Sequence, residues 1–212
     1  MAINFTSLDN TQTQEVVSPT PNSITPISLD LSKGDFLNLT KAAPSLTDVV
    51  LGASWNANQN GPTADLDLFV LLLNENGRLT SNSDVIFFNN KTANGVSLSG
   101  DNRTGVGEGD DETISINLNA VPSHIHKIVA CVNIFEAQEK GQTFGLIDDA
   151  KVRLVNKTTN EELAKFSLRD DYSTDTAIIF AELVRDENNH WYFHAIGEGK
   201  QGSIITIAQL FS

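Results

Sequence analysis

The amino-acid sequence predicts an all-β protein, a β-sandwich of two mainly antiparallel sheets. Val, Ile, Leu and Phe recur in short runs separated by Asn, Gly, Asp and Ser, a pattern that favours strands and turns over helices. Residues 27–31 alternate strictly between apolar and polar side chains, as in a strand with one buried face. Turn signals such as Asn76-Gly77 fall between the runs at the spacing that two packed sheets require.

The chain of 212 residues is long enough for one well-buried domain. Residues 1–24 carry Thr, Gln, Ser, Asn and two prolines with few large apolar groups, too few to order the segment by burial. No internal repeat or linker divides the remaining sequence. We therefore expect a flexible N-terminal extension over residues 1–24 and a single domain over residues 25–212.

Each expected strand is an apolar or alternating run between turn signals. Helix is expected only as single turns at residues 121–126 and 136–140. The expected strands are residues 27–31, 36–39, 49–55, 66–73, 85–88, 96–99, 113–118, 128–135, 151–155, 163–168, 177–184, 191–195 and 204–210.

The formal net charge of -13 limits the possible partners. It repels phosphate backbones and anionic lipid surfaces, so we expect no direct nucleic-acid binding, and the lack of a long apolar run argues against membrane insertion. Excess acid attracts divalent metals, although it also simply keeps proteins soluble. The single cysteine, Cys131, excludes an intramolecular disulfide, and no signal-peptide pattern is present. We expect a cytoplasmic protein with Cys131 in its core.

Residues 100–112 carry the strongest chemical signal. Five carboxylates, one arginine and four glycines share these thirteen residues, so the segment has a net charge near -4. Crowding like charge into a folded loop is unfavourable without a cation. Glycines let the backbone turn sharply, and carboxylate, amide and carbonyl oxygens are the ligands that calcium prefers. The spacing is not that of an EF-hand, since Arg103 stands where an acidic residue is required, and a solvated acidic turn is the alternative.

Asp65 and Asp67 form a second acidic pair, at the start of the apolar run 66–73. Because side chains alternate along a strand, the two carboxylates lie on one face, about 7 Å apart, and can approach one ion or two adjacent ions. Such a pair at the wet edge of a strand is common and is weak evidence alone. Together with residues 100–112, it predicts a calcium site.

Several segments resemble the TerD family of tellurite-resistance and stress-response proteins over roughly residues 27–205. The resemblance implies a calcium-binding β-sandwich with long metal-binding loops and two neighbouring calcium ions, in the bacterial cytosol. The segments that carry it are Ser32-Lys33-Gly34, residues 39–44, 64–68, Phe88-Asn89-Asn90, residues 100–112 and 171–180.

Carried over position by position, the resemblance implies a set of oxygen ligands. Glu136, after the run 128–135, is a weaker candidate. Two positions depart from the family pattern. Thr63 stands where many members have Asp, and this change would lower the affinity for one ion. Glu108 replaces an Asp in the glycine-rich segment. The implied carboxylate ligands are Asp65, Asp67, Asp101, Asp110 and Glu112, and the implied backbone oxygens are those of Asn90, Gly105 and Gly107.

Other motifs carry less weight. Residues 197–202 spell G-x-G-x-x-G, but no helix pattern follows, so we expect a tight turn rather than a nucleotide site. His124 and His126 lack Cys or acidic partners close in sequence, and His190 and His194 bracket an expected strand at residues 191–193, so we expect all four in surface or packing roles. No Ser, Cys or Thr lies in a recognisable nucleophile motif. Covalent catalysis is therefore not expected.

The leading hypothesis is a non-enzymatic calcium-binding protein of bacterial stress tolerance. Calcium would order the acidic loops, and unknown protein partners in a stress-response assembly would recognise that surface. The link to tellurite comes only from the resemblance. A calcium-dependent module that binds sugars or phosphates remains open, with Trp55 as an aromatic platform. A metal-dependent phosphoryl-transfer enzyme is disfavoured, since only Arg103 and Lys91 lie near the acidic groups.

Overall fold

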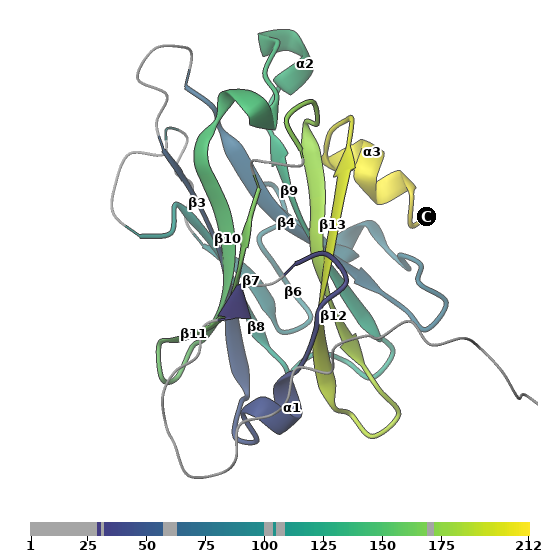
Figure 1. Cartoon of the computed structure of the whole chain (residues 1–212). Coiled ribbons are helices and arrows are strands. Elements are labelled where there is room, and N and C mark those ends of the chain that lie inside the picture. Colours follow the sequence, from purple (N-terminus) through teal and green to yellow (C-terminus); the bar gives the residue numbers. More distant parts are fainter. Residues whose placement is uncertain (1–28, 31, 57–62, 100–103, 105–108, 169–171) are drawn as a thin grey trace, which may run out of the picture.

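A computed structural model describes residues 29–30, 32–56, 63–99, 104, 109–168 and 172–212. Within these residues the strands form a seven-stranded sheet, in the order β1-β11-β10-β3-β8-β7-β6, and a six-stranded sheet, in the order β2-β13-β12-β9-β4-β5 (Figure 1). The predicted all-β sandwich is confirmed. The strands are β1 Leu29–Asp30, β2 Phe36–Asn38, β3 Asp48–Asn56, β4 Leu66–Leu73, β5 Val85–Ile86, β6 Thr92–Ala93, β7 Val96–Ser99, β8 Glu112–Asn117, β9 Lys127–Ile134, β10 Asp148–Asn156, β11 Glu161–Ser167, β12 Ala177–Arg185 and β13 Trp191–Lys200.

The strand pairs that this part of the chain shows are antiparallel, except for β1 with β11. Antiparallel registers bring particular strand ends together. Asp67 of β4 lies opposite Asn133 of β9, and Asn133 lies opposite Ala177 of β12. In the other sheet, Ala53 of β3 lies opposite Glu112 of β8. The starts of β4, β8 and β12 therefore share one end of the sandwich with the ends of β3 and β9.

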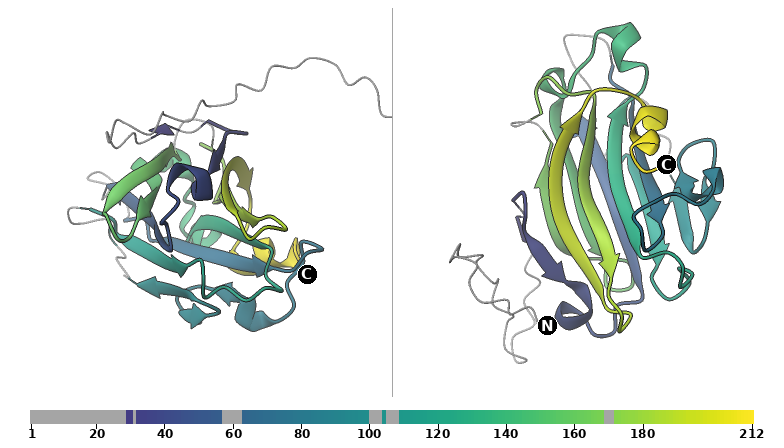
Figure 2. Two further views of the ribbon diagram at one scale, coloured as in Figure 1. Left: turned by 90° about the horizontal axis from the view of Figure 1, so that it is seen from below. Right: turned by 90° about the vertical axis from the view of Figure 1, so that its right-hand side faces the viewer.

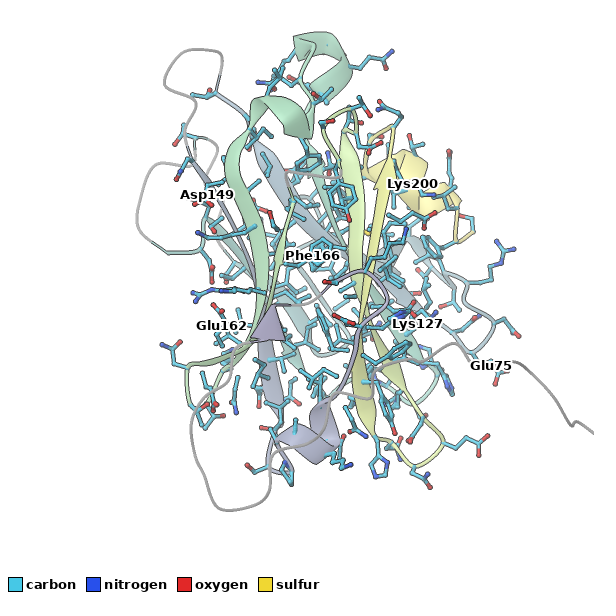
Figure 3. All side chains as sticks on the ribbon, viewed as in Figure 1. Glu75, Lys127, Asp149, Glu162, Phe166 and Lys200 are labelled. Carbon is cyan, nitrogen blue, oxygen red and sulfur yellow. The ribbon has the colours of Figure 1, made fainter. Side chains whose placement is uncertain are left out.

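The hydrophobic core fills the space between the sheets. Alternate residues of β4, from Leu66 to Leu72, face this core, while Phe69, Leu71 and Leu73 belong to a second apolar cluster on the outer face of the six-stranded sheet. Helix α3 (Ile204–Gln209) covers that outer cluster, and Figure 2 shows it beside the sheet. Burial on both faces explains why β4 is apolar almost throughout. Figure 3 shows side chains filling the sandwich and charged ones such as Glu162 at its surface.

The predicted strand at residues 204–210 is wrong, because this segment is helix α3. Ser203 and Thr206 form a capping box at its start, and Ile204 and Ile207 pack on the sheet while Ile205 is 70% exposed. Two β-branched residues in succession favour a strand locally, but the spacing of the buried pair is helical. Tertiary packing therefore overrides the local propensity.

Other boundaries differ more modestly. The expected strand 36–39 ends at Asn38, whose side chain accepts a hydrogen bond from the Lys41 amide and caps helix α1 (Leu39–Ala42). The expected strand 85–88 ends at Ile86, and residues 87–90 form a turn. Residues 82–84 and 144–146 form short 3-10 helices, η1 and η2, and the turn expected at 136–140 contains helix α2 (Ala137–Lys140). The turn expected at residues 121–126 contains no helix.

Two further predictions concern the ends of the chain and its membrane contacts. The extension expected over residues 1–24 lies outside the described residues, and the single domain over residues 25–212 stays a prediction. Of the helices that the structure describes, none is long and apolar enough to cross a membrane.

Candidate functional site

Several acidic residues gather at the end of the sandwich where β3 and β9 finish and β4, β8 and β12 begin. Asp65 and Asp67 open β4, Asp110, Asp111 and Glu112 open β8, and Glu136 follows β9. We call these six residues the acidic end. Helix α2, at the top of Figure 1, marks it. Three separate segments of the sequence therefore share one region of the fold.

Asp67, a member of the acidic end, forms a buried polar pair with Asn133 of β9. Their side chains are 7% and 3% exposed and lie opposite each other on β4 and β9. Their alternation with core-facing Leu66 and Leu68 places them on the outer face of the six-stranded sheet. The side-chain oxygen of Asn133, Oδ1, has no hydrogen-bond partner among the described residues. A buried carbonyl oxygen left this way is costly unless another group meets it.

Asp65 and Glu136 lie beside this pair. The backbone carbonyl of Asp65 accepts a hydrogen bond from the Phe135 amide at 2.8 Å, so the start of β4 is tied to the residue before Glu136. Glu136 has left-handed backbone geometry, with φ 55°, and its half-exposed carboxylate lies 3.4 Å from Lys140 Nζ. Thr63, where the family pattern has an Asp, is exposed, and its carbonyl accepts a hydrogen bond from Gln142 Nε2 at 3.2 Å.

Asn90 lies in the turn formed by residues 87–90. The rings of Phe88 and Phe135 meet edge to face at 5.9 Å between centroids, which brings this turn to the end of β9. The Asn90 side chain donates to the carbonyls of Ser83 and Val85, and its backbone oxygen accepts from the Phe87 amide at 3.1 Å. The backbone oxygen expected to bind metal thus keeps one lone pair for another group.

Glu112 bridges the two sheets. It belongs to β8, is 2% exposed, and its Oε2 accepts a hydrogen bond from the backbone amide of Leu68 in β4 at 2.6 Å. Leu68 is next to Asp67 in β4, so this hydrogen bond ties the start of β8 to the start of β4. Hydrogen bonds therefore tie the segments that carry Asp65, Asp67, Glu112 and Glu136 to one another, and the Asn90 turn lies beside the end of β9.

Asp110 belongs to the same end of the sandwich but lies on the outer face of the seven-stranded sheet. Its carboxylate receives two parallel hydrogen bonds from Arg153 of β10, from Nε at 2.8 Å and from Nη2 at 3.0 Å. Arg153 also approaches Glu162 of β11 at 3.4 Å. The hydrogen bonds to Asp110 raise the pKa of the Arg153 guanidinium above its ordinary value. The structure thus does not bring Asp110 to Asp67.

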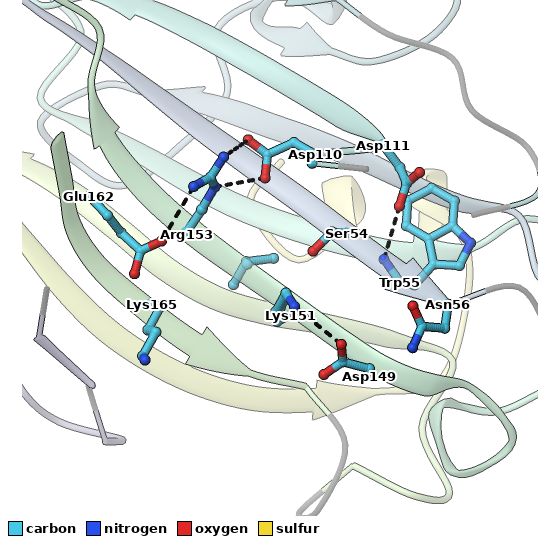
Figure 4. Close-up of a pocket in the computed structure, with 12 residues that line it drawn as sticks. Ser54, Trp55, Asn56, Asp110, Asp111, Asp149, Lys151, Arg153, Glu162 and Lys165 are labelled. Carbon is cyan, nitrogen blue, oxygen red and sulfur yellow. Dashed lines mark hydrogen bonds and ion pairs between the residues drawn. The ribbon is translucent and has the colours of Figure 1, made fainter. Parts of the chain in front are cut away.

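A cleft of about 530 Å³ opens on this outer face, next to Asp110 (Figure 4). Its lining contains carboxylates and cations that are already paired, such as Arg153 with Asp110 and Lys151 with Asp149 at 3.1 Å. Because these opposite charges are paired, the cleft has no region of uniform charge that would attract a charged ligand. The cleft therefore gives no separate indication of a substrate.

Three predicted ligands, Asp101, Gly105 and Gly107, lie outside the described residues. Among the residues that are described, no group of three or more His, Cys, Asp or Glu side chains is arranged to hold a metal ion. The described part of the site would instead combine carboxylates with amide and backbone oxygens. Asn133 was missed by the sequence interpretation, and the signal was available: it is the one strongly polar residue in the run 128–135.

The lesser motifs have structural explanations. Strand β13 continues to Lys200, so the tight turn expected at residues 197–202 is wrong, and helix α3 follows at Ile204 although no helix was expected there. Residues 198–200 pair with β12 and are part of the sheet. Gly197, at φ +57°, allows close packing, because a Cβ atom would lie 2.5 Å from the Tyr172 hydroxyl. His194 stacks on Phe36 with 3.8 Å between ring centroids. The Cys131 thiol is fully buried, and burial raises its pKa.

Comparison with known proteins identifies the relatives of this fold. A family model described as "TerD domain" matches residues 27–211. The chain is 44% identical to "Tellurium resistance protein TerD" of Serratia marcescens over 85% of this chain and 95% of that protein. It is 45% identical to "General stress protein 16U" of Bacillus subtilis (strain 168) over 86% and 96%, respectively.

A solved structure shares the architecture. It is a homologue of telluride resistance protein from Streptomyces coelicolor A3(2), with 20% identity and a TM-score of 0.68 over 79% of this chain and 99% of that chain. At this identity the likeness concerns the fold alone. The match of the family model across residues 27–211, with the relatives above, shows that the chain belongs to the TerD family.

Proposed function

We propose that the chain is a non-enzymatic protein that binds calcium at the acidic end. The observation that carries the proposal is the buried Asn133 Oδ1, which has no hydrogen-bond partner among the described residues and lies opposite Asp67. A bound cation would satisfy this carbonyl oxygen and offset the cost of burying a carboxylate beside it. Calcium suits the donors, because it accepts six to eight oxygen ligands, including carboxylates and amide carbonyls.

The residues that would hold calcium come from both sheets. Asp65, Asp67 and Asn133 would supply side-chain oxygens from the six-stranded sheet, and Glu112 would approach from the other. The backbone oxygen of Asn90 would complete this set. Bound calcium would neutralise clustered carboxylates and fix the loops that carry them. Two neighbouring ions, as the resemblance implies, would also require residues 100–108.

The proposed role is a contribution to tellurium resistance or general stress tolerance in the bacterial cytoplasm, as the names of the relatives suggest. Calcium would create an ordered surface that a protein partner recognises. The alternative of a sugar-binding module relied on Trp55 as an exposed platform. Trp55 is 3% exposed, and its Nε1 donates to the Ala64 carbonyl at 3.1 Å, so it cannot serve in that way.

The test is calorimetric titration of EDTA-treated protein with calcium and with magnesium. We expect calcium-selective binding of about two ions per chain. Asp67→Asn should lower the calcium affinity by about tenfold or more, because a carboxylate ligand loses its charge. Asp186→Asn, in the β12–β13 turn at the other end of the sandwich, is the matched control and should bind as the parent does. Absence of calcium binding by the parent, or equal binding by both variants, would refute the site.

A further inference from the structure

Asp110, an implied calcium ligand, is held in a geometry that suits a structural anchor. Arg153 donates a hydrogen bond to each of its carboxylate oxygens, in the parallel arrangement that arginine forms with carboxylates. The Asp110 side chain is 12% exposed, so this ion pair is shielded from solvent more than a surface pair would be. A metal ion would have to displace the guanidinium to use both oxygens.

The absence of a side chain at Gly52 leaves space for this carboxylate. Arg153 lies opposite Gly52 in the pairing of β10 with β3. A Cβ atom added to Gly52 would lie 2.2 Å from Asp110 Oδ2 and 2.3 Å from Cγ, so only glycine leaves room for the carboxylate. The Asp110 side chain therefore lies directly on the β3 backbone, beside Arg153 (Figure 4).

The next two residues are also fixed. Asp111 Oδ2 accepts a hydrogen bond from the Trp55 amide at 3.0 Å, and the Asp111 amide donates to the Ala53 carbonyl at 2.8 Å. Glu112 then crosses to the Leu68 amide of the other sheet. Three successive carboxylates thus contact three different strands: Asp110 contacts β10, Asp111 contacts β3 and Glu112 contacts β4. Because Asp110 and Asp111 are held in place, the position at which Glu112 enters the space between the sheets is also fixed.

We infer that Asp110 is an anchor rather than a calcium ligand, and that Arg153 is a positioning residue that acts through it. By fixing the start of β8, the Arg153–Asp110 pair keeps Glu112 on the Leu68 amide, beside Asp67. The inference rests on the proposed calcium function and divides its acidic residues into two groups. Asp65, Asp67 and Glu112 remain proposed ligands, whereas Asp110 is paired with Arg153.

The test compares Asp110→Asn, Arg153→Gln, their double variant and Gly52→Ala in the full chain. Calcium affinity is measured by calorimetry, and the melting temperature is measured in EDTA. Arg153→Gln leaves the Asp110 carboxylate intact, and Gly52→Ala displaces it with both charges retained. Each single variant should lower calcium affinity by a similar factor, about three to ten, and the double variant should be no worse than Asp110→Asn.

In EDTA the same variants should each lower the melting temperature by about 4 °C, again without additivity between positions 110 and 153. A much larger affinity loss in Asp110→Asn than in Arg153→Gln would overturn the inference, since it would make Asp110 a ligand. A gain of affinity in Arg153→Gln would also overturn it, because the guanidinium would then be competing with calcium. If the parent binds no calcium, the proposed function fails, while the EDTA measurements still decide whether Asp110 anchors β8.

Discussion

Asp67 and Asp110 open two strands at the same end of the sandwich, yet their surroundings differ. Asp110 accepts two hydrogen bonds from the Arg153 guanidinium on the outer face of the seven-stranded sheet. Asp67 is 7% exposed on the six-stranded sheet, opposite an amide whose carbonyl oxygen lacks a described hydrogen-bond partner. One carboxylate is neutralised by a guanidinium of the protein, and the other lies opposite a buried carbonyl oxygen that an external cation would stabilise. Proximity to an acidic cluster therefore does not by itself identify a metal ligand.

Substitution of Asn133 should have the largest effect on calcium binding. Asn133→Asp should raise calcium affinity by about tenfold, because it adds a negative charge at the proposed site, and should lower stability in EDTA through repulsion with Asp67. Asn133→Leu should do the opposite: it should weaken calcium binding while leaving the EDTA-treated protein as stable as the parent or more so. Calorimetry and denaturant unfolding measure the two effects. Calcium affinity that is unchanged in both variants would show that Asn133 does not face the metal.

Glu112 tests whether one residue serves both metal and fold. Glu112→Ala leaves the buried Leu68 amide without its acceptor and should cost about 2 kcal/mol of unfolding free energy in EDTA. Glu112→Gln keeps an acceptor oxygen, so it should retain most of that stability but lose about fivefold in calcium affinity with the charge. Equal stability loss in the two variants would mean that the charge, not the hydrogen bond, holds β8 to β4.

The smallest effect is expected at Glu136. Its side chain is 46% exposed and pairs with Lys140 at 3.4 Å, an arrangement typical of a surface ion pair. Glu136→Gln should change calcium affinity by less than about twofold, because solvent screens an exposed charge. A loss comparable to that of Asp67→Asn in the same titration would instead place Glu136 among the ligands.

The sequence predicted most of the strands because burial leaves a direct mark on composition. β4 was predicted with its observed bounds, since a run of apolar residues between polar ends has few alternatives. Helix α3 was missed because two successive isoleucines favour a strand when the surface that buries them is unknown. The buried face of α3 is decided by residues such as Phe69 and Cys131, which lie far away in the chain.

The same limit applies to the candidate site. Alternation along a strand predicted one shared face for Asp65 and Asp67, which stays a prediction, and composition indicated that residues 100–112 are acidic and glycine-rich. The partner of Asp110 could not be predicted, because Arg153 is 43 residues away and meets it only through the order β10-β3-β8. Asn133 became significant only when its register with Asp67 was known.

The hydrogen bond from Leu68 to Glu112 also protects an edge of the sheet. β5 pairs with β4 only at Val70 and Leu71, so among the described strands no neighbour covers the same edge near Leu68. Exposed backbone amides on an apolar strand are a template for pairing with another molecule. Glu112 occupies this amide and places a negative charge beside it, which discourages the addition of a foreign strand. Its loss would therefore leave the Leu68 amide open in the folded protein, where a strand of another molecule could pair with it.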